Sequence, residues 1–334
     1  MINARITAYV TSSILLLMAC SLLRTAQAQD ITGEIAQSAL PYITIDKILP
    51  ESGANWQIHL IQTRDEIYVP IGVRKPEGNG PFPMILIGSG QGRDGILKIE
   101  QSMDRFQELM GRLVDRGYVA AFINFRNEVP GYYNEIAGAE LLEDNVSGGD
   151  RTLQSVSTLD SDDYLSIVEH AKALSYTDPS GIGAIGSSHS GEIILKGTAV
   201  IELGAAVPAE PAAIEYLGMD IREARRDASG RELQMQDVGV TKSIADKDAT
   251  MLRTSTINTP LLVIGRDTDH LQGIFRLTYE WIEEAGKDVA WKSFDHPVHG
   301  FTLLGKGDGQ GFEVDKIQEE AFALYMKFFD EHLK

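Results

Sequence analysis

The chain has 334 residues, of which 48 are Asp or Glu and 30 are Lys or Arg, so its formal net charge is −18 at pH 7. This excess of negative charge argues against nucleic acid as a partner and disfavours polyanionic substrates. The single cysteine, Cys20, excludes a disulfide framework within the chain and a zinc site built from several thiolates.

The first 28 residues have the layout of a secretory signal peptide. Arg5 is followed by the apolar run 14–23, and the small-residue stretch Ala-Gln-Ala ends at Ala28. The run is short for a membrane-spanning helix, so we expect cleavage after Ala28 and a secreted or periplasmic protein. The alternative is a lipoprotein, because residues 17–20 resemble a lipobox in which Cys20 carries the lipid. Only in that case do we expect contact with a membrane.

Residues 29–334 contain no internal repeat and no long linker rich in Pro, Gly or Ser, so we expect a single domain there. In its first part, alternating and apolar residues at 55–61 and 66–76 predict an antiparallel pair of strands. From residue 83 onward, short apolar runs alternate with segments of helical periodicity. The predicted strands are 83–88, 118–125, 181–186, 199–207, 259–265 and 289–294, and the predicted helices include 106–117, 161–174 and 277–286.

This alternation predicts an α/β fold, with a mainly parallel, doubly wound sheet and helices on both faces. In such open sheets, ligands bind at the carboxyl ends of the strands. Residues 208–258 interrupt the alternation of strands and helices with a charged stretch that is too long for an ordinary connection. We expect this segment to form a helical cap or lid insertion over the strand ends. The alternative is a surface insertion without function.

A candidate nucleophile lies in the sequence Gly-Ser-Ser-His-Ser at 186–190, directly after a predicted strand. A tight strand-turn-helix can present a serine hydroxyl only if the residues two before and two after it are small, as in the motif G-x-S-x-G. Ser188 meets this condition, because Gly186 precedes it and Ser190 follows it. Ser190 stands where glycine is usual, which weakens the match. The two other serines, Ser187 and Ser190, each have a larger residue at one of the two positions. The alternative for Ser188 is a serine in a glycine-rich turn without catalytic meaning.

Four stretches together resemble the α/β-hydrolase superfamily, in particular its dienelactone hydrolase and prolyl oligopeptidase-like branch. They occur in the order that this superfamily shows, within a resemblance that covers about residues 65 to 334. The four stretches are 113–127, 178–192, 259–271 and 296–301. The resemblance implies an α/β-hydrolase fold and a Ser-His-Asp triad.

In this superfamily the nucleophile is followed along the chain by the acid and then by the histidine. The resemblance therefore implies Asp269 as the acid, since Asp-His-Leu follows the strand 259–265, and His299 as the base, in the stretch His-Gly-Phe. Asp267 is the alternative acid, in which case Asp269 would cap a helix. His296 is the competing histidine, but Pro297 follows it and a role in shaping the loop is the simpler expectation.

A tetrahedral intermediate requires backbone N–H donors at the developing oxyanion. One expected donor is the amide of His189, immediately after the nucleophile. The second comes from the loop after strand 83–88, where Ser89 is the first choice and Gly90 or Gln91 the next. Many relatives have His-Gly where this chain has Ile-Gly at 87–88, so the register of this donor stays open. Arg126 matches an arginine of relatives, for which we expect a structural role.

The sequence thus predicts a serine hydrolase that cleaves a small, neutral carboxylic ester through an acyl-enzyme, with no cofactor and no metal. Three rivals remain. A prolyl oligopeptidase-like peptidase is one, although such enzymes usually carry an N-terminal propeller and fewer than 60 residues precede this region. A non-catalytic binding protein of the same fold is another. The third is a metal hydrolase whose ligands would be His296, His299, Asp267 and Asp269.

Overall fold

The computed structural model describes residues 42–64, 66–90, 99–125, 156–219, 234–305 and 313–334, with only the backbone for 156–159. All of these residues belong to one unit, Pro41–Lys334. The predicted signal peptide, with Cys20 and Ala28, lies outside the described residues, as do Gln91 and Arg126. None of the helices within the described ranges is both long enough and apolar enough to cross a membrane.

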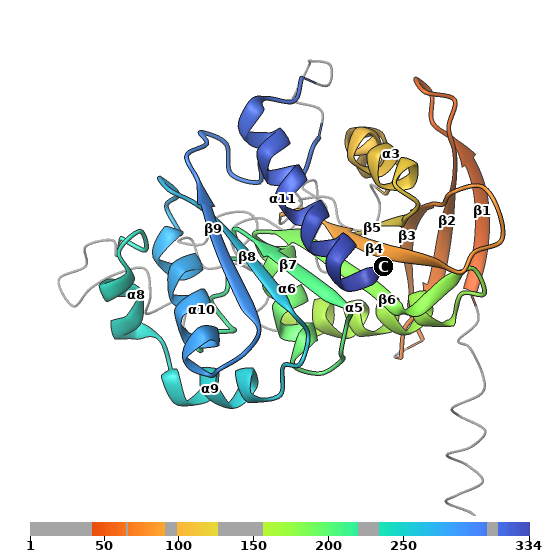
Figure 1. The fold of residues 1–334 in the computed structure, drawn as a ribbon. Helices are drawn as coiled ribbons and strands as arrows, with labels where there is room; N and C mark the ends of the chain where they lie inside the picture. The colour runs from red at the N-terminus through yellow and green to blue at the C-terminus, as the bar shows by residue number, and fades with distance from the viewer. Residues whose placement is uncertain (1–41, 65, 91–98, 126–155, 220–233, 306–312) are drawn as a thin grey trace, which may run out of the picture. The chain divides into compact units, whose positions relative to one another are not determined.

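The described strands form one nine-stranded sheet in the order β1-β2-β3-β5-β4-β6-β7-β8-β9 (Figure 1). The pairs β1·β2, β2·β3 and β3·β5 are antiparallel, and all later pairs are parallel. The mainly parallel sheet expected from the sequence is therefore confirmed. The strands are β1 (Tyr42–Ile48), β2 (Asn55–Gln62), β3 (Tyr68–Arg74), β4 (Phe82–Gly88), β5 (Val119–Ile123), β6 (Thr177–Ser187), β7 (Ala205–Ala209), β8 (Leu261–Arg266) and β9 (Val289–Phe294).

Helices cover both faces of this sheet, because its central strands are apolar on both sides. Along β4, Met84 and Leu86 join one hydrophobic core, while Ile85 and Ile87 join the other. The first core includes side chains of α5 (Val156–Ala173), α6 (His189–Thr198) and α10 (Gln272–Glu284). The second includes side chains of α2 (Ile99–Arg105), α3 (Gln107–Asp115) and α11 (Lys316–Leu333), and Figure 1 shows α3 and α11 on the face opposite α5, α6 and α10.

The structure differs from the sequence prediction at two strands. The prediction of a strand at 199–207 is wrong in its first part, since Val200 and Ile201 donate their amides to the Gly197 carbonyl at the end of α6 and the strand begins only at Ala205. Strand β1 was not predicted. It is an edge strand whose residues are mostly exposed, and the short alternation of apolar and polar residues at 43–46 was overlooked.

The predicted insertion 208–258 begins inside β7 and contains α8 (Val238–Ile244) and α9 (Lys247–Ser255). Both helices lie beside α10 in Figure 1. The Gly273 amide donates to the Met235 carbonyl at 2.9 Å, and Lys247 pairs with Glu284 at 2.6 Å. The described part of this segment is therefore attached to α10, and its action as a lid stays a prediction.

A buried pair of histidines joins the antiparallel strands to α5. His59 Nδ1 lies 2.9 Å from His170 Nε2, and the two side chains are 1% and 7% exposed. Burial lowers the pKa of His59 to about 4 and, with the neighbouring His59, that of His170 to about 3. Both rings are therefore neutral in the folded protein near pH 7.

We predict that this pair makes the fold sensitive to acid. The unfolded chain takes up protons on both rings as pH falls below about 6.5, whereas the folded chain does not, so stability is lost between pH 6.5 and the folded pKa values. At pH 5 the loss is about 2 kcal/mol for each ring, or about 4 kcal/mol for the pair. Urea titrations of the wild type and of His59→Gln/His170→Gln at pH 7.5 and 5 measure it. Parallel pH dependence of the two proteins would contradict the prediction.

Candidate active site

Ser188 occupies a strained turn between β6 and α6. Its φ is 55° and its ψ is −116°, a conformation that costs free energy for any residue with a side chain. Backbone hydrogen bonds hold the turn. The Ser188 amide donates to the Ala209 carbonyl at 3.0 Å, and the Ser188 carbonyl accepts from the amides of Glu192 at 3.1 Å and Ala212 at 3.0 Å. The half-buried Ser188 side chain is thereby presented at the carboxyl end of the central strands.

Small residues on either side allow this turn to close. A Cβ at Gly186 would lie 2.8 Å from the backbone carbonyl of Ser190, and one at Gly191 would lie 2.9 Å from the Gly186 oxygen. Ser190 fits where glycine is usual because Gly88 makes room for it: a Cβ at Gly88 would lie 2.6 Å from the Ser190 side chain. The substitution of serine for glycine is thus accommodated by a second glycine on the neighbouring strand.

The loop after β4 borders the nucleophile. A Cβ at Gly90 would lie 3.3 Å from Ser188 Cβ, and the Ser190 hydroxyl donates to the Ser89 carbonyl. His189 begins α6, and its ring is directed to Asp160, with Nε2 2.7 Å from Oδ2. The two stretches expected to supply oxyanion donors therefore flank Ser188. The assignment of the His189 and Ser89 amides themselves stays a prediction.

Asp269, rather than Asp267, contacts the histidine. Asp269 is fully buried, and its Oδ2 lies 2.6 Å from His299 Nδ1. Its other oxygen accepts from the Leu271 amide at 2.8 Å. Asp267 is exposed, and its amide donates to the Phe294 carbonyl at 3.0 Å.

Arg266 is a partner of Asp269 that sequence reasoning missed. It is buried, and its Nε donates to Asp269 Oδ2 at 2.8 Å, while Nη1 donates to the His296 carbonyl at 2.9 Å. The guanidinium therefore ties the acid to the histidine loop. Its place at the last residue of β8 was the available signal, because side chains at strand ends of such sheets face the ligand site.

His299 has the environment of a base, and His296 has that of an anchor. Burial opposes protonation of His299, but the hydrogen bond to Asp269 and the charge of Glu210 outweigh it and raise its pKa. Burial likewise opposes ionisation of Asp269, yet hydrogen bonds from His270 and His299 hold its pKa well below the usual range. His296 is buried, and its Nε2 lies 2.8 Å from Oδ2 of Asp315, the N-cap residue of α11.

Ser188 and His299 lie on neighbouring segments. A Cβ at Gly300, next to His299, would be 3.4 Å from the hydroxyl of Ser187, next to Ser188. Among the described residues no hydrogen bond joins Ser188 to His299. Hydrogen bonds between nucleophile and base are often long without substrate and tighten in the complex. The structure therefore brings both residues to one end of the sheet, and their pairing stays a prediction.

Glu210 is a further residue that sequence reasoning missed. It directly follows β7, is fully buried and has a positive φ of 46°. Its Oε2 accepts from the Gly300 amide at 2.8 Å, and its Oε1 lies 3.8 Å from His299 Nδ1. A lone acidic residue after the apolar strand 205–209 was the signal that could have pointed to it.

The four ligands of the rival metal hydrolase do not come together among the described residues. In the described part of the chain, the residues whose ligand atoms converge are Asp269, His270 and His299, within 4.8 Å of one another. His296 is instead engaged by Asp315, and Asp267 is exposed. Oδ2 of Asp269 and Nδ1 of His299 are 2.6 Å apart, a hydrogen-bond separation that leaves no position for an ion between them.

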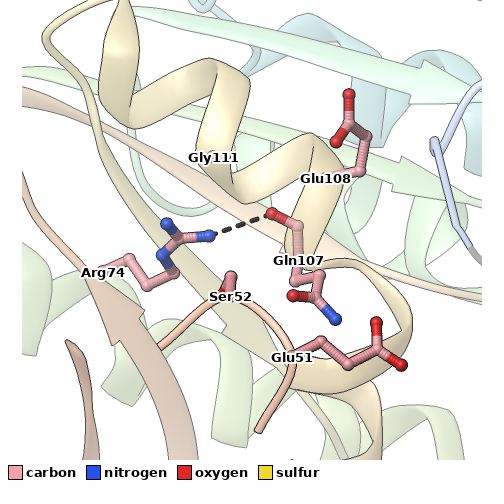
Figure 2. A pocket seen from close by; sticks show the side chains of 6 residues that line it. All are labelled: Glu51, Ser52, Arg74, Gln107, Glu108 and Gly111. Atoms are coloured by element: carbon pink, nitrogen blue, oxygen red, sulfur yellow. Dashed lines mark hydrogen bonds between the residues drawn. The ribbon is translucent and has the colours of Figure 1, made fainter. Parts of the chain in front are cut away.

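A surface hollow of about 340 Å³ lies at the other end of the sheet (Figure 2). Its residues are Glu51, Ser52, Arg74, Gln107, Glu108 and Gly111. Arg74 pairs with Ala120 near the amino end of β5. The hollow therefore lies at the amino ends of the parallel strands, whereas Ser188 lies at their carboxyl ends. In Figure 2 the guanidinium points to the Gln107 carbonyl, to which it donates at 2.9 Å. The hollow is therefore no part of the candidate active site.

No family model and no curated protein matches this chain at a significant level. Solved structures do match. A protein assigned as a dienelactone hydrolase from Klebsiella pneumoniae is 14% identical with a TM-score of 0.53, over 87% of this chain and 99% of that one. Native esterase 2 of Thermogutta terrifontis is 17% identical with a TM-score of 0.53, over 85% and 94%.

A dipeptidyl peptidase 4 from Porphyromonas gingivalis is also similar, with 17% identity and a TM-score of 0.55 over 84% of this chain. This chain spans 36% of the length of that peptidase. At these identities the likeness is one of fold. The chain thus has the α/β-hydrolase fold, and the resemblance drawn from its sequence is confirmed at that level, since both a dienelactone hydrolase and a peptidase are among the similar structures.

We predict that Gly186→Ala disrupts the turn. The added methyl group would lie 2.5 Å from Ile194 Cδ1 and 2.8 Å from the backbone carbonyl of Ser190, so the Ile194 side chain and the Ser190 backbone must both shift, at a cost of about 1–3 kcal/mol. Thermal unfolding together with reaction of Ser188 with a fluorophosphonate measures both effects. Gly111→Ala is the control, since its new methyl group would meet Arg74 at an ordinary 3.5 Å. A Gly186→Ala protein of unchanged stability would refute this account of the turn.

Proposed function

We propose that this protein is a serine hydrolase that cleaves carboxylic esters through an acyl-enzyme intermediate. The observation that carries the proposal is the strained Ser188 turn at the same sheet end as the 2.6 Å Asp269–His299 hydrogen bond. A positive φ at a residue with a side chain persists where the surrounding structure enforces it, and such strain is concentrated at functional sites. An ester or amide carbonyl is the group on which this set of residues acts.

In the proposed first step, Ser188 Oγ attacks the carbonyl carbon while its proton moves to Nε2 of His299. Asp269 keeps the other ring proton on Nδ1 and stabilises the imidazolium. The amides of His189 and Ser89 donate to the oxyanion. The carbon–oxygen bond to the alcohol then breaks, and the alcohol leaves with the proton from His299 Nε2. Water repeats the sequence on the acyl-enzyme and releases the acid and free Ser188.

The net charge of −18 favours neutral over polyanionic esters, so we propose a small neutral ester as the substrate class. We also propose export through the signal peptide 1–28, to the periplasm or outside the cell. The alternative is a lipid anchor at Cys20, and in that case the enzyme would act at a membrane surface.

A peptidase is the second candidate function. It is supported by the similarity of fold to the dipeptidyl peptidase and to an acylaminoacyl peptidase of Pyrococcus horikoshii, which is 18% identical with a TM-score of 0.51. The chain spans 36% and 44% of those proteins, so their activity is not carried over as a whole. The esterase and the dienelactone hydrolase match this chain over nearly their full length, which favours ester hydrolysis.

We predict that a fluorophosphonate probe labels Ser188. The base removes the hydroxyl proton, so this serine reacts while ordinary serines do not. Mass spectrometry of the modified peptide identifies the site, and Ser188→Ala should reduce ester hydrolysis by at least about 10⁴-fold. Ser180→Ala, at an exposed serine of the same strand, should label as the wild type does. Undiminished ester hydrolysis by a folded Ser188→Ala protein would refute the proposal.

We further predict that p-nitrophenyl esters of short acids are hydrolysed and that aminoacyl p-nitroanilides are not. The amide leaving group requires proton donation within a site that binds the peptide on both sides, and the proposal assigns only the acyl-transfer machinery to this chain. Initial rates on the two panels measure the difference. Faster turnover of the anilides would select the peptidase instead.

A further inference from the structure

Two buried carboxyl groups, and not one, approach the same nitrogen of His299. Asp269 Oδ2 lies 2.6 Å from Nδ1, and Glu210 Oε1 lies 3.8 Å from it. Asp269 follows β8 and Glu210 follows the neighbouring strand β7. Both carboxyl groups are completely shielded from solvent. Because burial of a carboxyl group is costly, two of them at one imidazole require a physical reason.

The first reason is mechanical. Glu210 Oε2 accepts the Gly300 amide at 2.8 Å, and Gly300 has a φ of 84°, a conformation that glycine adopts readily. Glu210 itself is held by its amide, which donates to the Ile264 carbonyl at 2.6 Å on β8. The side chain therefore links the rigid sheet to the backbone directly after His299. This link fixes the position of the loop and thereby that of the His299 ring, which the loop carries.

The second reason is electrostatic. Oε1 of Glu210 has no hydrogen-bond partner among the described residues, yet it faces two cationic or ionisable groups, Arg266 Nε at 3.6 Å and His299 Nδ1 at 3.8 Å. An unsatisfied buried carboxyl oxygen is costly unless a positive charge is close. Protonation of His299 supplies such a charge at the moment that the base takes the serine proton.

The charged groups around Glu210 come from three segments. Arg266 belongs to β8, Asp269 and His270 to the turn after β8, and His299 to the loop after β9. With both acids ionised, the imidazolium and the guanidinium balance the two negative charges. Burial raises the pKa of Glu210 to about 7, against the opposing effects of His299 and the Gly300 amide. The charge of Glu210 in turn raises the pKa of His299. The two groups therefore titrate as a coupled pair.

We propose that Glu210 is a positioning residue of the active site and a second acid for His299. Its carboxylate stabilises the imidazolium from a second strand and holds the histidine loop through Gly300, so that the base does not depend on Asp269 alone. Glu210 forms no bond to substrate and acts only through His299. This inference rests on the proposed function in its catalytic part, but the pairing of Glu210 with His299 can be measured without turnover.

The first test follows the His299 ring by ¹⁵N NMR over a pH titration. Glu210→Gln keeps an oxygen acceptor for the Gly300 amide and removes the charge, so the pKa of His299 should fall. Glu192→Gln is the matched control, because Glu192 is a buried glutamate whose pKa is also raised to about 7, but its carboxyl group accepts from the Tyr216 amide instead. An unchanged His299 pKa in Glu210→Gln would overturn the proposal.

The wild-type protein provides the same test if Glu210→Gln does not fold. The carboxyl carbon of Glu210 should then show an inflection at the pH where His299 titrates, because the two protonation states are coupled. A Glu210 signal that is indifferent to the titration of His299 would equally overturn the proposal. Glu210→Asp retains the charge and shortens the side chain, so it should preserve the His299 pKa while weakening protection of the Gly300 amide from hydrogen exchange.

The catalytic test uses ester hydrolysis in a background without Asp269. Loss of the acid from a triad with a single carboxylate costs about 10⁴-fold in kcat. With Glu210 present, Asp269→Ala should lose only about 10²-fold, and Glu210→Gln in that background should remove the remaining hundredfold. In the wild-type background, Glu210→Gln should cost tenfold or less and should move the acid limb of kcat/KM to lower pH. Equal rates for Asp269→Ala with and without Glu210→Gln would refute the proposal that Glu210 acts as a second acid for His299.

The two proposals fail separately. In one case, the wild type hydrolyses no ester and remains unlabelled at Ser188, while Glu210→Gln still lowers the His299 pKa. That result would refute the proposed function and support the coupling of Glu210 to His299. In the other case, the protein proves to be a serine hydrolase in which Glu210→Gln changes neither the His299 pKa nor the residual rate of Asp269→Ala. That result would support the proposed function and refute the role of Glu210.

Discussion

The candidate site depends on one backbone constraint, the positive φ of Ser188 between β6 and α6. That conformation is costly, and the hydrogen bonds to Ala209 and Ala212 that maintain it come from the segment at the end of β7. The same segment supplies Glu210, which holds the loop of His299 through Gly300. The turn of Ser188 and the loop of His299 are therefore held by one stretch of backbone.

A compact group of charges extends from this constraint. Arg266 neutralises part of the charge of Asp269 and donates to the carbonyls of His296 and Pro297, so one cation holds Asp269 and the histidine loop together. The group contains two carboxylates for one guanidinium, which leaves it short of a positive charge. A protonated His299 restores the balance. The electrostatics of the site thus favour a protonated His299, whose pKa is raised.

The sequence was sufficient for those parts of the structure that local pattern determines. Apolar runs predicted β4, β8 and β9, and the small residues around Ser188 predicted its turn. The edge strand β1 was missed although residues 43–46 alternate between apolar and polar, because the alternation is short and the strand is mostly exposed. Asp269 was preferred to Asp267 only through the family resemblance, since the direction of the turn after β8 decides which carboxyl group is buried against His299. Glu210 was missed because its contact with the loop of His299 joins segments that are distant along the chain. Arg266 was missed although it lies only three residues before Asp269, at the end of β8.

Asp315 has two structural roles, with a consequence for the dynamics of the site. One of its oxygens caps the amides of Ile317 and Gln318 at the start of α11, and the other holds His296 in the histidine loop. Helix ends fray on fast timescales, and each such opening of the first turn of α11 loosens the support of that loop as well. One carboxyl group thus serves both the first turn of α11 and the loop that carries His296 and His299, so a change at Asp315 would alter the helix end and that loop together.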